Sequence, residues 1–88
     1  MSRTTWKFDA CPEHGWQEVE MPRGAEPIHY DSEGFLWAVV DPEAAVEAQR
    51  VGVWGTGWGV PEGARHVHTT ISPNGWVWHL FVPEAPDG

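Results

Sequence analysis

The chain has 88 residues, seven of them tryptophan, and a formal net charge of -8 from 13 acidic and five basic residues. This charge disfavours nucleic-acid binding, which needs clustered Lys and Arg side chains, and no apolar stretch approaches the roughly 20 residues of a membrane span. The single cysteine, Cys11, excludes an internal disulfide, so a domain this small must gain stability from large side chains, a metal or a second copy of itself. The start, MSRTTWKF, lacks the apolar core of a secretory signal, and we expect a cytoplasmic protein.

Short segments of alternating apolar and polar residues, separated by Pro and Gly, recur at intervals of about 8 to 12 residues. This spacing predicts a single all-β domain over 1–88. The expected architecture is a small sandwich or a partly open barrel of about six or seven short antiparallel strands. The last residues, 83–88, are expected to form a flexible tail.

The first two predicted strands are TTWKFDA and QEVEMP. Trp6 and Phe8 share one face of the first, and the second repeats the alternation with Val19 and Met21 inward. We expect the intervening CPEHG to turn the chain so that these two strands form a hairpin.

Two later segments, FLWAVVD and WVWHLFV, are apolar on both faces, so each is expected to be a central strand. Between them, Asp41 and Pro42 give the one helix-start signal, which predicts at most one short helical turn before strand resumes near Arg50. The expected core side chains are Trp6, Phe8, Trp37, Val39, Trp76, Trp78 and Leu80.

The stretch ISPNGW predicts a tight turn. Pro73 suits the second position of a type I turn, and Gly75 suits the left-handed position that follows. This turn would place Ser72 opposite Trp76, and therefore His68 opposite Leu80.

The stretch GVWGTGWGVP, residues 52–61, contains a GxGxG pattern. A dinucleotide fingerprint needs a strand before it and a helix after it, and here VPEGAR follows, so we do not assign a phosphate site. We expect the glycines to leave room for tryptophan side chains. The alternative is that Trp54 and Trp58 form an exposed stacking platform for a sugar, a base or a peptide.

The histidines raise the question of a metal site. Strand alternation would put His66 and His68 side by side, and Cys11 and His14 could complete a set of four zinc ligands. We favour ordinary turn and surface histidines, and assign neither a metal nor a cofactor. His79 is expected to be a hydrogen-bonded core or interface residue. No acid and nucleophile are spaced to work with it, so an enzyme is not expected.

The most cationic short stretch is RHVH, which begins at Arg65. Two or more copies of the chain could bring these stretches together into a phosphate site, and the alternative is a solvated loop end. The candidate binding residues are Trp54, Trp58, Arg65, His66 and His68.

Several strings of this sequence resemble those of a family of small uncharacterised phage and prophage proteins. The strings WKF, MPRGAEPI, LWAVVDPE, GTG and VWHLF stand in the order of the family's W/Y-K-Y/F, LPxGA, LWALVDP, GTG and VWHVF, over roughly residues 6–82. The resemblance implies phage origin and a compact β-rich domain, and it implies no activity. Family members commonly read GTGH where this chain has Trp58, so a role of that histidine does not carry over. The residues that match the shared strings are Trp37, Asp41, Pro42, Gly55, Gly57, Trp78 and His79.

From these observations we expect a non-catalytic phage accessory protein that self-associates and binds a host protein or a host signalling molecule in the host cytoplasm. The alternative is a structural component of the virion, such as a capsid decoration or a tail accessory subunit. A third reading is a small zinc-dependent enzyme.

Overall fold

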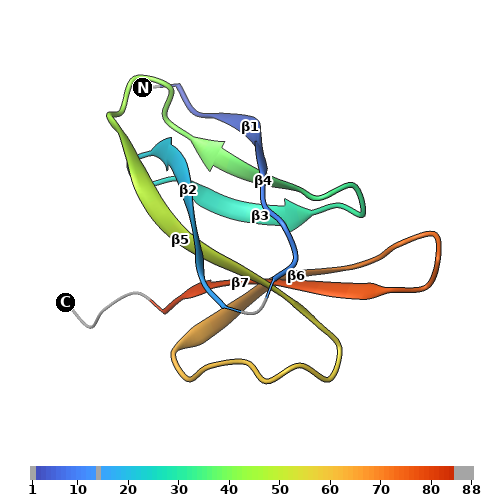
Figure 1. Ribbon diagram of the computed structural model, residues 1–88. Helices are drawn as coiled ribbons and strands as arrows, with labels where there is room; N and C mark the ends of the chain where they lie inside the picture. The colour runs from blue at the N-terminus through green and yellow to red at the C-terminus, as the bar shows by residue number, and fades with distance from the viewer. Residues whose placement is uncertain (1, 14, 85–88) are drawn as a thin grey trace.

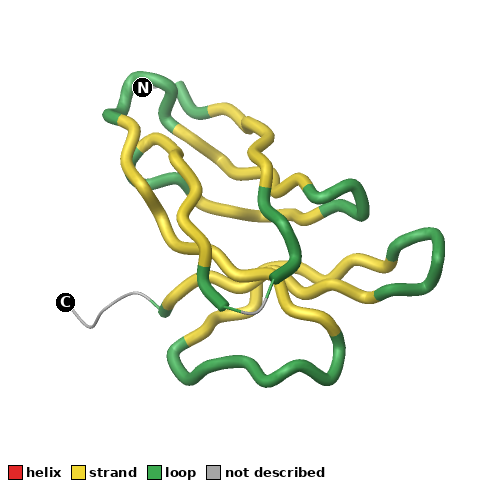
Figure 2. The backbone as a smooth tube through the Cα atoms, viewed as in Figure 1, coloured by secondary structure: helices red, strands yellow, loops and turns green. Residues whose placement is uncertain are grey.

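The computed structural model describes residues 2–13 and 15–84. Seven strands follow one another along the chain: β1 (Thr4–Asp9), β2 (Gln17–Pro22), β3 (Glu26–Tyr30), β4 (Phe35–Val40), β5 (Val46–Gly55), β6 (Ala64–Ile71) and β7 (Val77–Pro83). All of the regular secondary structure in this part of the chain is β-strand (Figure 2). The described residues include no helix that is long and apolar enough to cross a membrane. The predicted all-β fold is confirmed.

The strands form two antiparallel sheets, one in the order β1-β4-β3 and one in the order β2-β5-β7-β6. Strand β5 is long because its first half pairs with β2 and its second half with β7. In Figure 1 the β1-β4-β3 sheet lies above the β6–β7 hairpin, and β5 runs past both. The two sheets approach each other where β3 meets β6 and β7.

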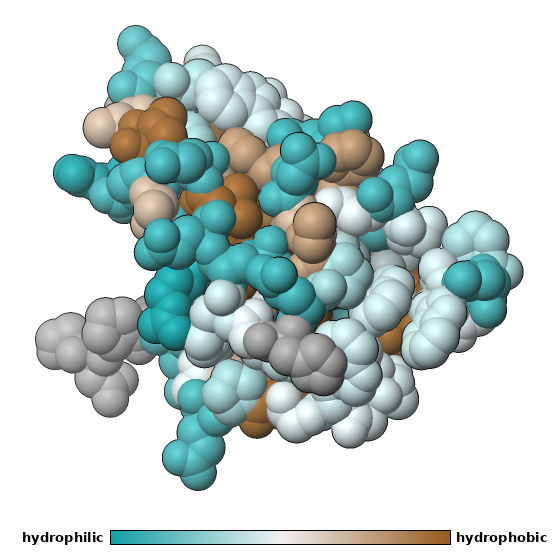
Figure 3. Space-filling model, viewed as in Figure 1, coloured by the Kyte–Doolittle hydropathy of each residue, from teal (hydrophilic) through white to brown (hydrophobic). Residues whose placement is uncertain are grey.

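The core lies between the two sheets and is built from alternate residues of the strands. Leu36, Ala38 and Val40 of β4 are fully buried, which places one face of this central strand against the other sheet. The remaining members of the buried cluster are Ala10, Val19, Met21, Tyr30, Val51, Val53, Leu80 and Val82. Apolar side chains also reach the surface, as separate brown areas among polar ones in Figure 3.

The expected core is partly wrong. Leu80 is fully buried, and Phe8 and Trp78 pack against the core from its margin. Trp6 and Trp76, in contrast, are 40% and 58% exposed. Trp6 lies on an edge strand with a neighbour on one side only, and Trp76 lies in a turn, so alternation alone overestimated their burial.

Trp37 and Val39 lie on the outer face of β4 and are half-buried, so they too fall outside the buried cluster. The Asp31 carboxylate accepts hydrogen bonds from the Phe35 N–H at 3.1 Å and from the Trp37 indole N–H at 3.1 Å. Burial raises the pKa of Asp31, but these bonds, a bond from the Glu33 N–H and the charge of His29 lower it below its usual value. The outer face of β4 is therefore fixed by polar contacts.

The hairpin expected between the first two strands is also wrong. β1 pairs with β4, and β2 pairs with β5 in the other sheet. The connecting segment crosses between the sheets and is closed by Gln17, whose side chain accepts from the Cys11 N–H at 3.1 Å and donates to the Cys11 carbonyl at 2.5 Å. Crossing places Ala10, which follows β1, and Val19 and Met21 of β2 in the same core, and Phe8 of β1 packs against its margin.

The helical turn expected after Asp41 is a tight non-helical turn. The Asp41 carboxylate accepts from the Glu43 N–H at 3.0 Å, and the Asp41 carbonyl accepts from the Ala44 N–H at 3.1 Å. Strand begins at Val46, earlier than the expected start near Arg50, because this segment pairs with β2.

The β6–β7 turn is confirmed. The Ser72 N–H donates to the Trp76 carbonyl at 2.7 Å, Gly75 has a φ of 89°, and His68 lies opposite Leu80. Of the expected tail, Pro83 belongs to β7, and the Glu84 N–H donates to the Gly63 carbonyl at 2.7 Å. Residues 85–88 lie outside the described part of the chain.

Tyr30 fixes the end of β3 to the chain that leaves β1. Its hydroxyl donates to the Ala10 carbonyl at 2.6 Å, and both residues are buried. Burial raises the pKa of Tyr30 to about 12, with further contributions from the charges of Cys11 and Asp31. The hydroxyl therefore stays a neutral donor in the core.

Candidate functional site

A bulge in β6 separates the two histidines of RHVH. His66 lies opposite Phe81 and His68 lies opposite Leu80, so Val67 is the extra residue between them. Because Phe81 and Leu80 are consecutive and point to opposite faces of β7, His66 and His68 do as well. The predicted side-by-side pair is wrong.

The expected set of four zinc ligands fails with this pair, since His66 and His68 do not share a face. In the described part of the chain, no three His, Cys, Asp or Glu side chains are grouped so that they could hold a metal ion. Cys11 is exposed, and His14 lies outside the described residues.

His68 belongs to the seam between the sheets. Its ring centroid lies 4.2 Å from that of His29 on β3. Burial lowers the pKa of His68, and the charges of His29 and His66 lower it further. The neutral form of the His68 imidazole is therefore favoured where β3 and β6 meet.

Arg65 lies where two hollows adjoin, one among β3, β5 and the end of β7 and one between β3 and β6. The first has a volume of about 460 Å³, and buried side chains of the core, including Met21 and Val82, form part of its lining. The second has a volume of about 450 Å³. Because Arg65, Glu26 and Pro27 line both hollows, the two form one groove, which we call the Arg65 groove.

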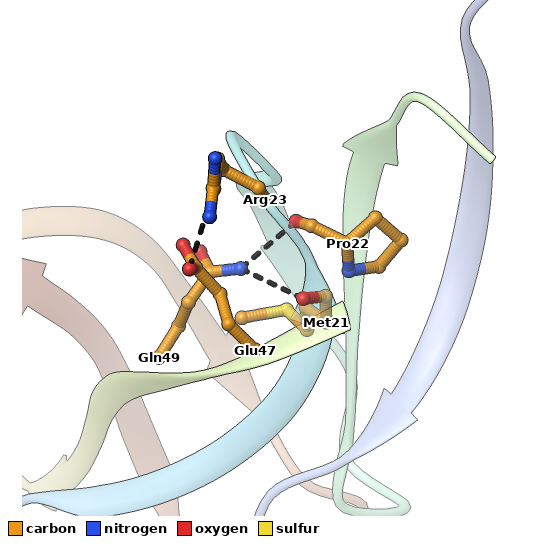
Figure 4. A network of polar contacts seen from close by, with 5 residues as sticks. All are labelled: Met21, Pro22, Arg23, Glu47 and Gln49. Atoms are coloured by element: carbon orange, nitrogen blue, oxygen red, sulfur yellow. Dashed lines mark hydrogen bonds and ion pairs between the residues drawn. The ribbon is translucent and has the colours of Figure 1, made fainter. Parts of the chain in front are cut away.

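One wall of the Arg65 groove is held by polar contacts between β2 and β5 (Figure 4). The Gln49 side-chain amide donates to the carbonyls of Met21 at 3.1 Å and Pro22 at 2.9 Å. Beside it, the Arg23 Nε lies 3.4 Å from the Glu47 carboxylate. Gln49 and Met21 both line the groove, so this wall is fixed by hydrogen bonds to the backbone.

Arg65 differs from the other four cationic side chains of the protein. Arg3 and Arg23 form ion pairs with Glu26 and Glu47. Lys7 lies over the rings of Phe35 and Trp37, and Arg50 lies 5.1 Å from the ring of Trp16. Within residues 2–13 and 15–84, no carboxylate lies within 4.0 Å of the Arg65 guanidinium. An unpaired guanidinium beside an apolar hollow is suited to an anionic group of a ligand.

On the outer face of the four-stranded sheet, Trp54 is 2% exposed. It makes edge-to-face contacts with Trp16 at 5.1 Å and Phe81 at 5.6 Å between ring centroids. A Cβ at Gly52 would lie 1.9 Å from the Trp54 ring, so the glycine makes room for the indole. The interpretation of the glycines as architecture is confirmed at Gly52, and Trp54 has no exposed face for a ligand.

Trp58 is half-buried and reaches back over Gly55, where a Cβ would lie 2.9 Å from the indole. Its ring also makes an edge-to-face contact with Trp78 at 5.6 Å. Trp54 and Trp58 therefore lie in different clusters and do not form one platform.

A chain of hydroxyl and imidazole groups runs along the same outer face as Trp54. The two ring nitrogens of His79 lie 2.8 Å from the hydroxyls of Thr56 and Thr69, and the Thr69 hydroxyl lies 2.7 Å from His66 Nε2. His79 is hydrogen-bonded at both nitrogens, as expected for a structural histidine. The arrangement contains no carboxylate to orient the imidazole.

The sequence analysis missed Thr56, Thr69 and Trp76 as candidate site residues. The signal for Thr69 was present, because the predicted register of the β6–β7 turn places it opposite His79. No local pattern pointed to Thr56, whose contact with His79 joins two strands that are distant in sequence.

Comparison with known proteins gives a family and no close relative of known function. The profile of a family described as "Domain of unknown function (DUF7352)" matches residues 1–88, and the chain belongs to this family. No curated protein matches, and no solved structure matches.

Proposed function

We propose that this protein is a non-catalytic accessory protein of a phage, which binds a small anionic molecule of the host in the Arg65 groove. The observation that carries the proposal is the guanidinium of Arg65, which has no carboxylate partner among residues 2–13 and 15–84 and lies beside an apolar hollow. A phosphate or carboxylate would pair with Arg65, and an apolar part of the ligand would cover the lining near Met21 and Val82.

The charge of the protein limits the size of the ligand. With a net charge of -8, the protein repels large polyanions, whereas one anionic group on a small molecule meets mainly the local field of Arg65. Glu26 and Glu84 also line the groove, and they suit a ligand that offers hydrogen-bond donors beside its anionic group. A host signalling molecule fits these requirements better than an acidic host protein.

We further propose that the protein acts as a homo-oligomer, joined at β1. Edge strands with free backbone groups pair readily unless proline, bulges or cover protect them. β3 and β6 each carry a bulge and lie against one another, and β2 ends in Pro22. β1 pairs with β4 without a register shift and contains no proline.

A structural role in the virion is the second candidate, because a regular free edge with the exposed Trp6 also suits repeated contacts in an assembly. Proteomic analysis of purified virions separates the two roles. Abundant peptides of this protein would favour the virion component, and their absence would favour an accessory protein that acts in the host cytoplasm.

The test of the proposed function is a native mass spectrum of the protein purified from bacterial cells. We expect an oligomer that carries the additional mass of a small anion. Arg65→Gln should lose that mass while keeping the subunit number, and the control Arg23→Gln, which breaks only the exposed pair with Glu47, should retain it. A protein without extra mass, or a mass that survives Arg65→Gln, would contradict binding at this groove.

A further inference from the structure

A separate pocket lies at the end of the four-stranded sheet, between the β5–β6 loop and the β6–β7 turn. It has a volume of about 320 Å³ and is lined by Gly55, Thr56, Trp58, Gly75, Trp76 and Val77. None of these residues lines the Arg65 groove, so a ligand here would be bound independently of one there.

Three tryptophan rings form a row at this pocket. Trp78 lies in the middle, with an edge-to-face contact to Trp58 and a nearly parallel contact to Trp76, whose ring centroid is 5.9 Å away at an interplanar angle of 12°. Trp76 is 58% exposed. The row therefore ends in an indole with a large accessible surface.

The exposed indole of Trp76 is held on a rigid turn. The Ser72 hydroxyl interacts with the Asn74 side chain and lies 3.1 Å from the Trp76 N–H. The Thr56 N–H donates to the Val77 carbonyl at 3.3 Å and so ties the β5–β6 loop to the same turn. A ligand that stacks on Trp76 would lose little of its binding free energy to ordering of the protein.

The chemistry of the lining selects a neutral ligand that carries hydroxyl groups. No lining residue has an ionisable side chain, so a charged ligand would gain no ion pair here. The polar side chain is that of Thr56, whose hydroxyl lies 2.8 Å from His79 Nε2 and is therefore oriented by the imidazole. A flat apolar surface beside an oriented hydroxyl matches a sugar ring, which offers an apolar C–H face and hydroxyl groups at its edge.

We infer that this pocket binds a neutral carbohydrate, with one sugar ring stacked on Trp76 and a sugar hydroxyl hydrogen-bonded at Thr56. A nucleobase also stacks on indole, but a nucleic acid would bring its phosphates to a protein with a net charge of -8. A neutral carbohydrate can stack on the tryptophan ring and needs no charged partner in the lining, so it is the ligand class that fits this pocket.

The test is an array of neutral oligosaccharides probed with the full-length protein, followed by calorimetric titration of the strongest binder. We expect Trp76→Ala to weaken binding by about tenfold, which corresponds to the loss of one aromatic stacking contact. Thr56→Val, which keeps the shape and removes the hydroxyl, should weaken it by a few-fold. The control Val46→Ala shortens an exposed apolar side chain at the start of β5, away from this pocket, and should leave the affinity unchanged.

Circular dichroism melting of each variant checks that the fold is retained. If no neutral oligosaccharide binds at about 1 mM, or if Trp76→Ala and Val46→Ala weaken binding equally, the proposal is wrong. The Arg65→Gln variant, which should lose the anion bound in the Arg65 groove, should still bind the carbohydrate. The two sites share no residue.

Discussion

Trp54 and Trp76 occupy two regions of the molecule that use the same side chain in different ways. Trp54 is 2% exposed, lies over Gly52 and is contacted by Trp16 and Phe81. Trp76 is 58% exposed and is positioned by the hydrogen bonds of its own turn. An indole that is enclosed by neighbouring rings contributes to stability, whereas one that contacts a single ring among the described residues, that of Trp78, keeps most of its surface for a ligand.

The largest expected difference between the two regions is in the loss of stability when each tryptophan is replaced by alanine. Trp54→Ala leaves a cavity among packed rings and should lower the free energy of unfolding by about 3 to 5 kcal/mol. Trp76→Ala removes a ring that is already mostly in water and should cost less than about 1 kcal/mol. Urea unfolding followed by circular dichroism measures both. An equally large loss for Trp76→Ala would mean that a second copy of the chain covers this ring in solution.

A smaller effect is expected from the glycine beneath Trp54. Gly52→Ala would force a methyl group against the indole, and such overpacking costs about 1 to 3 kcal/mol. Gly59→Ala is the matched control, since a Cβ there has no atom within 4 Å, and it should change stability by less than about 0.5 kcal/mol. Differential scanning calorimetry of the two variants compares them. Equal melting temperatures would show that the Trp54 ring can move aside, and that the packed region is looser than its contacts indicate.

The smallest effect concerns two histidines that, like Trp54 and Trp76, differ in exposure. His68 lies in the seam between the sheets, and His66 lies on the exposed outer face. Because the folded protein lowers the pKa of His68, the unfolded chain takes up a proton at this residue more readily below its usual pKa of about 6.5. The free energy of unfolding should therefore be largest above that pH and should fall as the pH decreases from 7 to 5.

Urea midpoints measured over this pH range test the expectation, and His68→Gln should flatten the fall. If the midpoints of His68→Gln follow the same pH profile as those of the original protein, burial and the neighbouring charges do not lower the pKa of His68 enough to affect stability. His29→Gln provides a second comparison, because it removes the neighbouring imidazole and leaves the half-buried His68 in place.

Local pattern was sufficient for the strands and for one turn. Val19 and Met21 are buried as alternation in QEVEMP predicts, and the turn chemistry of Pro73 and Gly75 correctly placed His68 opposite Leu80. These features depend on a residue and its neighbours within a few positions. The expectation of an uncharacterised family is likewise consistent with the family to which the chain belongs, which is described as a domain of unknown function.

Features that join distant segments could not be predicted in this way. The sequence shows that β4 is apolar on both faces, but only the packing of the second sheet decides that Leu36, Ala38 and Val40 form the core while Trp37 and Val39 lie outside it. A hairpin between β1 and β2 satisfied every local rule. The crossing between sheets instead brings Ala10, Val19 and Met21 into one core, with Phe8 packed at its margin.

The candidate sites divide along the same line. The sequence by itself determined an all-β domain, its glycine-dependent packing of tryptophan and the cationic character of RHVH. The tertiary structure decided that a bulge separates His66 from His68, that Arg65 has no carboxylate partner in the described part of the chain, and that Trp76 remains exposed. Alternation and turn propensity depend on local backbone geometry, whereas burial, ion pairing and register shifts depend on which strands meet.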